Sequence, residues 1–296
     1  MGARTHVLTK NKSSLPTARP PSGQTLSGLG RRALLVLPAA FPALGLAAPR
    51  SHLAAPAVHR GAKPPPPLVV LDPGHGGKDP GAIGVSGTYE KHIAEAASAE
   101  LERRLLAGGR YRVARTRDRD IFIPLEDRVA IAQGRRAALF ISMHADALHD
   151  PSVRGASVYT LSDHASDGQT AALAARENSA DRFAGPQFAG TSPEVRAILA
   201  SLVRQETRRE SGQMARSVVA SLRGRVALLD NPERHAGFVV LKSASIPSVL
   251  VEMGFMSNRL DEAALRRADH RADVASAMTR AVDAYFTVGS YMQTTG

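Results

Sequence analysis

Three short apolar runs, each followed by a side chain that can bind a metal or move a proton, constrain this chain most strongly. The runs are Leu68–Leu71, Ala138–Met143 and Ser248–Val251. Their lengths are typical of buried strands. His75 follows the first run after a Pro-Gly turn, His144 ends the second, and Glu252 ends the third. The carboxyl ends of parallel strands meet at one edge of a sheet, where ligands bind in open α/β folds. We therefore expect these three side chains to be neighbours in space.

Strand-like and helix-like stretches alternate along the rest of the chain. Apolar residues recur at four-residue spacing from Glu90 to Leu106, which predicts one buried face of a helix. Further strands are expected at Tyr111–Arg115, Ser157–Leu161 and Phe238–Leu241, and further helices at Pro124–Gln133, Gln169–Ala184 and from about Val195 to Leu222. The alternation predicts an α/β fold. We expect a single domain over residues 68–290, with a twisted, mostly parallel sheet of about six strands flanked by helices.

The segment before this domain has the features of an export signal. Residues 1–47 carry six basic side chains and no acid, and Arg31-Arg32 precede an apolar stretch that is broken by two prolines. The stretch is too short and too interrupted to predict a transmembrane span. A basic region, a short apolar region and a small-residue end predict a signal peptide over 1–47 and export to the periplasm. The paired arginines resemble a twin-arginine signal. A basic leader can also contain two adjacent arginines by chance. Residues 48–67 end in four prolines and are expected to form a spacer.

Composition limits the chemistry that remains. The chain has no cysteine, which excludes disulfides, zinc–thiolate sites and thiol nucleophiles. Its net charge of +11 raises the question of a nucleic-acid partner. Six of those charges lie in the predicted leader, and no surface of alternating aromatic and basic residues is evident. We therefore expect no nucleic-acid partner.

The histidines and carboxylates at the predicted strand ends could form a metal site. Glu90 begins the helix after the first loop, where the positive end of the helix favours an ionised carboxylate. His75, Glu90 and His144 would leave the fourth position of a zinc ion open for water, and Glu252 could carry the proton. The spacing matches no short zinc motif. Histidines that are simply hydrogen-bonded at strand ends, with Glu90 as a charge at the helix start, therefore remain an alternative.

The sequence around these residues resembles that of the bacterial zinc N-acetylmuramoyl-L-alanine amidases of the type 3 family. This family includes periplasmic amidases that split septal peptidoglycan. The matching blocks are Leu71–Gly77 (LDPGHGG), Tyr89–Lys91 (YEK), Ile141–Ala147 (ISMHADA) and Val251–Asn258 (VEMGFMSN), with a further similar stretch at Leu125–Arg128. The resemblance extends in order from Leu68 to Phe286. Met143 stands where a branched aliphatic residue is commoner in the family.

The resemblance implies a function for each of the four residues. It makes His75, Glu90 and His144 ligands of Zn²⁺ and Glu252 the catalytic carboxylate. The implied reaction is hydrolysis of the amide between N-acetylmuramic acid and L-alanine of the peptidoglycan stem peptide, with a role in cell-wall remodelling and daughter-cell separation. Asp72 and Asp146 could orient the histidines or only stabilise turns.

The region at about 163–192 is the main departure from a minimal catalytic domain. In regulated members of the family a helix here covers the zinc, and an acidic side chain on it occupies the open position. The predicted helix Gln169–Ala184 offers Asp167, Gln169 and Glu177 as candidates, and the sequence does not choose among them. Such autoinhibition would imply an activator protein that displaces the helix. An ordinary surface insertion is the alternative.

Two other functions fit parts of the sequence. A zinc peptidase that cuts within the stem peptide could use the same ligand order, but nothing here resembles the substrate-carboxylate site of zinc carboxypeptidases. A peptidoglycan-binding or regulatory module without activity is the second, and the presence of all four site residues argues against it.

Overall fold

The computed structural model describes residues 65–183 and 205–294 of the chain. The predicted signal peptide, most of the proline-rich spacer and the end of the 163–192 insertion lie outside the described residues. Within the described part, no helix combines the length and the apolar character needed to cross a lipid bilayer.

Six strands form one mixed sheet. They are β1 (Leu68–Pro73), β2 (Arg112–Arg115), β3 (Leu139–His144), β4 (Ala156–Leu161), β5 (Leu228–Ala236) and β6 (Ser248–Glu252). Their order across the sheet is β2-β1-β3-β6-β4-β5. The first four in this order run parallel to one another, whereas β4 pairs antiparallel with β6 and parallel with β5. The predicted α/β class and the six-stranded, mostly parallel sheet are confirmed.

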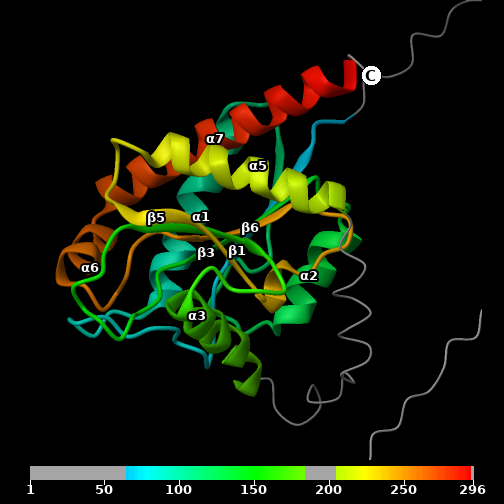
Figure 1. The fold of residues 1–296 in the computed structure, drawn as a ribbon. Coiled ribbons are helices and arrows are strands. Elements are labelled where there is room, and N and C mark those ends of the chain that lie inside the picture. The colour runs from blue at the N-terminus through cyan, green and yellow to red at the C-terminus, as the bar shows by residue number, and fades with distance from the viewer. Residues whose placement is uncertain (1–64, 184–204, 295–296) are drawn as a thin grey trace, which may run out of the picture. The chain divides into compact units, whose positions relative to one another are not determined.

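Helices cover both faces of the sheet (Figure 1). They are α1 (Glu90–Ala107), α2 (Leu125–Gly134), α3 (Gly168–Asn178), α5 (Gln205–Leu222), α6 (Arg259–Arg266) and α7 (Ala268–Thr294), with short 3-10 helices η1 (Ser179–Phe183) and η2 (Val239–Leu241). In Figure 1, α5 and α7 lie above the sheet and α3 lies below it. The sheet is therefore the middle layer of three.

Side chains alternate between the two faces of the sheet along each strand, and this divides the hydrophobic core into two clusters. In β1, Val69 and Leu71 pack with the apolar faces of α1, α5 and α7, whereas Val70 packs on the other side with residues from α2, α3 and η2. Successive strand side chains point to opposite faces, so a strand buried on both faces is apolar throughout. This explains why β1, β3 and β6 are recognisable from the sequence as continuous apolar runs.

The prediction of a strand at Phe238–Leu241 is wrong. Residues Val239–Leu241 form the 3-10 helix η2, and the strand lies just before it, at Leu228–Ala236. The apolar side chains of η2 instead fill the cluster beneath the sheet. β5 was missed because it is an edge strand that contains Pro232 and mostly polar residues, as edges commonly do.

Candidate active site

His75, Glu90 and His144 meet at the carboxyl edge of the sheet, as predicted. Nε2 of His75 lies 3.0 Å from Oε2 of Glu90, and Nδ1 of His144 lies 3.1 Å from Oε1 of the same carboxylate. The two imidazole centroids are 4.9 Å apart, with the rings nearly perpendicular. All three side chains are buried. Glu90 therefore bridges the two histidines.

His75 is aimed by its own loop. Its backbone has φ of +60°, a left-handed conformation that is uncommon for residues other than glycine. Its Nδ1 pairs with Oδ2 of Asp79 at 2.8 Å, which leaves Nε2 facing Glu90. Burial lowers the pKa of His75, but the carboxylates of Glu90 and Glu177 and the bond to Asp79 raise it, and the net pKa lies well above its ordinary value. A carboxylate behind an imidazole is a common feature of metal-binding histidines.

Glu90 is held at the first position of α1. Oε2 accepts a hydrogen bond from the Ala82 amide and Oε1 accepts one from the Ala145 amide, both at 2.8 Å. Burial raises the pKa of this carboxyl, but His75 and His144 outweigh burial and hold the pKa well below its usual range. The side chain is therefore an ionised carboxylate with a fixed orientation.

Two glycines allow this close approach. A Cβ on Gly74 would collide with the His144 ring, and one on Gly81 would lie 2.6 Å from Cδ2 of His75 and 2.7 Å from Oε2 of Glu90. Gly81 also has φ of +68°. No other residue type leaves the required room at these positions.

Glu252 lies beside His144 because β3 and β6 pair those two residues directly. Its side chain is fully buried, and Oε2 accepts a hydrogen bond from the Asp146 amide at 2.9 Å. Oε1 has no hydrogen-bond partner. Burial and the nearby carboxylates of Glu90 and Asp146 raise the pKa of Glu252 well above its ordinary value. A carboxyl with a raised pKa and an unpaired oxygen is suited to proton transfer near neutral pH.

A fourth candidate ligand comes from α3. Oε2 of Glu177 lies 3.2 Å from Nδ1 of His144 and 3.7 Å from Nε2 of His75, and its side chain is only 4% exposed. Among the three candidates on the insertion, Glu177 is the one that reaches the site. Asp167 instead caps the start of α3 by accepting from the Thr170 amide, and Gln169 lies in the first turn, two helical turns before Glu177.

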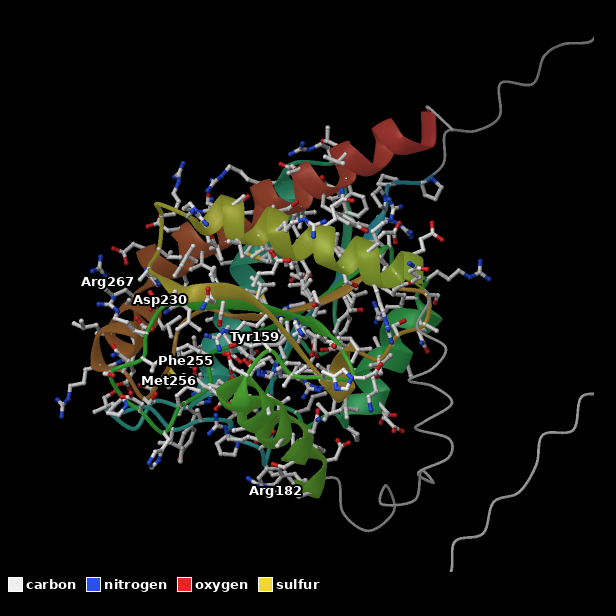
Figure 2. All side chains as sticks on the ribbon, in the orientation of Figure 1. Tyr159, Arg182, Asp230, Phe255, Met256 and Arg267 are labelled. Atoms are coloured by element: carbon white, nitrogen blue, oxygen red, sulfur yellow. The ribbon has the colours of Figure 1, made fainter. Side chains whose placement is uncertain are left out.

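The helix α3 is fastened mainly by polar contacts. Nε of Arg176 lies 2.8 Å from Oδ2 of Asp146, and Asn178 exchanges two hydrogen bonds with the backbone of residues 237 and 239. In η1, which follows directly, Asp181 accepts from the Leu125 amide. The helix has a single large apolar side chain, Leu173, and it is buried. Arg182 lies just past α3 at the end far from the sheet (Figure 2).

The acidic residue that orients His75 is Asp79, not Asp72. Asp72 contacts neither histidine, because its oxygens accept from Thr116, Arg128 and Ser142. Asp79, which is not among the residues predicted for the site, pairs with His75 Nδ1 instead. Its position four residues after His75 was visible in the sequence, but the left-handed turn that brings the two together was not.

The donor atoms fit a metal ion. One nitrogen or oxygen each from His75, Glu90, His144 and Glu177 lies within 4.8 Å of the others. Glu177 Oε1 is buried and has no hydrogen-bond partner, and His75 Nε2 forms no hydrogen bond even though Glu90 Oε2 lies 3.0 Å away. Buried polar atoms are normally satisfied. Two imidazoles with carboxylates form a donor set that is typical of zinc.

Comparisons with known proteins identify the family of this chain. The family described as N-acetylmuramoyl-L-alanine amidase matches residues 69–284. The amidase AmiA of Escherichia coli K12 is 40% identical over 220 residues, which cover 74% of this chain and 76% of AmiA. AmiC of Neisseria meningitidis is 38% identical over 221 residues, covering 74% of this chain and 52% of AmiC.

The fold is also similar to those of solved amidase structures. The amidase AmiC2 of Nostoc punctiforme superposes with a TM-score of 0.51 at 27% identity, covering 75% of this chain and 97% of that one. The CwlD amidase of Clostridioides difficile, solved in complex with the GerS lipoprotein, has the same fold with a TM-score of 0.56 at 22% identity, covering 75% and 99% of the two chains. The chain therefore belongs to the type 3 family of N-acetylmuramoyl-L-alanine amidases.

Proposed function

We propose that this protein is a peptidoglycan amidase that hydrolyses the bond between N-acetylmuramic acid and the L-alanine of the stem peptide, and that it acts in cell-wall remodelling and cell separation. The observation that carries this proposal is the convergence of His75, Glu90, His144 and Glu252 on one edge of the sheet in a chain that belongs to the amidase family.

We assign His75, Glu90 and His144 as ligands of Zn²⁺. A zinc ion held there would supply a Lewis acid for the substrate carbonyl and would lower the pKa of a water to near 7. Oε1 of Glu252 is the free acceptor nearby, so Glu252 takes the proton of the attacking water and returns it to the leaving amine. The Asp146 amide holds the other oxygen of Glu252 in place.

We further propose that the described conformation is autoinhibited. Glu177 supplies a fourth donor to the same group of atoms, which would occupy the position that a catalytic zinc keeps open for water. Because α3 is fastened by few apolar contacts, its release requires little free energy compared with unfolding of the domain. An activator protein that binds and displaces α3 would then open the site.

We also propose export to the periplasm through residues 1–47, with Arg31-Arg32 as a twin-arginine signal. Peptidoglycan is the substrate proposed above, and it lies outside the cytoplasmic membrane. A leader of this kind would bring the enzyme to it.

One assay tests the activity. The purified, zinc-loaded protein and its Glu177→Ala variant are incubated with muropeptides, and the products are separated by mass. Free sugar strands with intact stem peptides are expected. Shortened stem peptides would identify a peptidase, and unchanged substrate with the zinc-loaded Glu177→Ala variant would contradict the amidase proposal.

A second variant tests the role of Glu252. Glu252→Gln preserves the acceptor for the Asp146 amide but cannot carry a proton. It is expected to abolish turnover and to leave the zinc content nearly unchanged. Loss of zinc from this variant would show that Glu252 is a ligand rather than the base.

A further inference from the structure

The backbone of the loop that carries His75 is bound by buried cations. Pro73 O accepts from both Arg117 and Arg128, Gly74 O accepts from Arg117, His75 O accepts from Arg128, and Gly77 O accepts from Lys91. The one remaining carbonyl in this stretch, that of Gly76, accepts from the Asp79 amide. Five consecutive carbonyls are thus satisfied, and four of them by charged side chains, which form stronger hydrogen bonds than neutral donors do.

Arg128 makes the contact that bears directly on His75. Two nitrogens of one guanidinium reach across the turn, Nη1 to Pro73 O at 2.8 Å and Nη2 to His75 O at 2.7 Å. His75 is one of two residues other than glycine with positive φ in the described chain. That conformation is sterically unfavourable for residues with a Cβ, so a specific interaction has to hold it.

Arg128 is itself fixed on its other side. Nη1 also bonds Oδ1 of Asp72 at 2.9 Å, and Nε bonds the Ile123 carbonyl at 2.9 Å. Asp72 in turn accepts from Ser142, which lies two residues before His144 on β3. The loop of one histidine and the strand of the other are therefore tied to the same buried ion pair.

Stability alone explains this ion pair poorly. Arg128 is 2% exposed and Asp72 is fully buried, and apolar residues of similar volume commonly stabilise a fold as well as a buried ion pair does. Lysine would replace Arg128 only in part, because a single ammonium lacks the planar fork that binds two carbonyls at once. The geometry calls for an arginine at this position.

We infer that Arg128 is a positioning residue for the metal site: it holds the left-handed backbone of His75 so that Nε2 faces Glu90 before any ion binds. Arg128 makes no contact with the group of donor atoms and acts only through the loop. The inference rests on the metal site proposed above. It predicts that loss of Arg128 weakens metal binding by the folded protein, beyond any effect on stability.

The test measures zinc affinity rather than activity. Metal-stripped wild type, Arg128→Met and Arg128→Lys compete for zinc with a chromophoric chelator, at a temperature where circular dichroism shows each protein to be folded. Removal of an outer-sphere partner commonly lowers metal affinity by about 10- to 100-fold. We expect a loss in this range for Arg128→Met and a smaller loss for Arg128→Lys, together with altered visible bands of the cobalt-loaded variants.

Val218→Ala is the matched control for stability. Val218 is fully buried on α5, far from the loop in sequence, and its truncation is expected to lower the melting temperature and to leave zinc affinity at the wild-type value. Wild-type affinity in both Arg128 variants would overturn the inference, as would a loss in Val218→Ala that matches theirs. If Arg128→Met does not fold, Arg128→Lys decides. Failure of the wild type to bind zinc would refute the proposed metal site itself, and the inference with it.

Discussion

Oε2 of Glu177 lies 3.2 Å from Nδ1 of His144, although strand β4 separates β3 from α3 along the chain. Glu177 also faces His75 at 3.7 Å. A carboxylate in this position would compete with water or a substrate group for a metal ion bound by these histidines. If α3 blocks the site as proposed above, this single contact couples displacement of α3 to the chemistry at the edge of the sheet.

Removal of the Glu177 carboxylate should activate the enzyme. We expect Glu177→Ala to raise basal hydrolysis of muropeptides by about tenfold or more, since a change of about 1.4 kcal/mol in the docking equilibrium is a factor of ten. Rates are measured by chromatographic release of stem peptides without any activator. Gln169→Ala, on the same helix but two turns away, is the control and should leave the rate unchanged. Equal rates for Glu177→Ala and wild type would argue against a blocking role.

Arg176 should contribute to docking of α3 to a smaller degree. Its side chain is 46% exposed while that of Asp146 is 2% exposed, so solvent screens the pair and its contribution is about 0.5–1 kcal/mol. We expect Arg176→Ala to raise basal activity about two- to fivefold. Arg182→Ala removes an arginine from the same segment that does not contact the site. An equal rise in both variants would mean that general loss of positive charge is responsible.

The cap of α3 gives a prediction that does not depend on catalysis. Asp167 accepts from the Thr170 amide and pairs with Arg234 at 2.7 Å, and loss of an N-cap costs about 1 kcal/mol. Hydrogen exchange of the α3 amides should therefore accelerate about fivefold in Asp167→Ala, while exchange in α5 stays at the wild-type rate. Asp163→Ala, an exposed aspartate before the helix, serves as the reference. Unchanged exchange in α3 would show that the cap does not limit its opening.

Glu252 should destabilise the metal-stripped protein at neutral pH. Its raised pKa, caused first by burial and then by neighbouring carboxylates, means that folding favours the protonated form. The contribution of this group to stability is therefore full below its unfolded pKa of about 4.3 and is lost as pH rises through the folded value. At pH 7.5 in EDTA, Glu252→Gln should melt about 3 °C or more above wild type. The difference should vanish near pH 4, and a constant difference at both pH values would contradict the titration.

The leader can be tested by its arginines. If residues 1–47 direct export through the twin-arginine route, a paired Arg31→Lys, Arg32→Lys substitution should leave most of the protein in the cytoplasm, because the lysines keep the charge but not the motif. Cell fractionation and immunoblotting measure the distribution. Replacement of Lys10 and Lys12 by arginine is the matched control. Normal export of the paired variant would favour a general secretory signal.

Much of the fold could be predicted because the central strands are buried on both faces. β1, β3 and β6 consist of continuous apolar residues, so their ends, and the side chains placed there, were visible in the sequence. β5 was not, because an edge strand such as this one need not be apolar. The chain then leaves the sheet at Phe238 through apolar residues that look like a strand but form η2.

The part of the candidate site that lies at the ends of the central strands was predictable from the sequence. Convergence of His75, His144 and Glu252 followed from the strand ends, and their assigned roles remain predictions. The partner of His75 was not predictable, because Asp79 reaches it only through a left-handed turn. The choice of Glu177 over Asp167 depended on which face of α3 meets the sheet. A helix with four alanines and one leucine among its eleven residues does not mark that face clearly.

The direct pairing of His144 with Glu252 has a consequence for how the site tolerates change. The separation of these two side chains is a property of the hydrogen-bond ladder between β3 and β6, which continues past them as the Met253 amide bonds the His144 carbonyl. A slip of one residue between the strands would turn one of the two side chains to the opposite face. The loops around the site can therefore change in length or sequence while His144 and Glu252 keep their spacing. Substrate specificity can then change without a change in the geometry of these two residues.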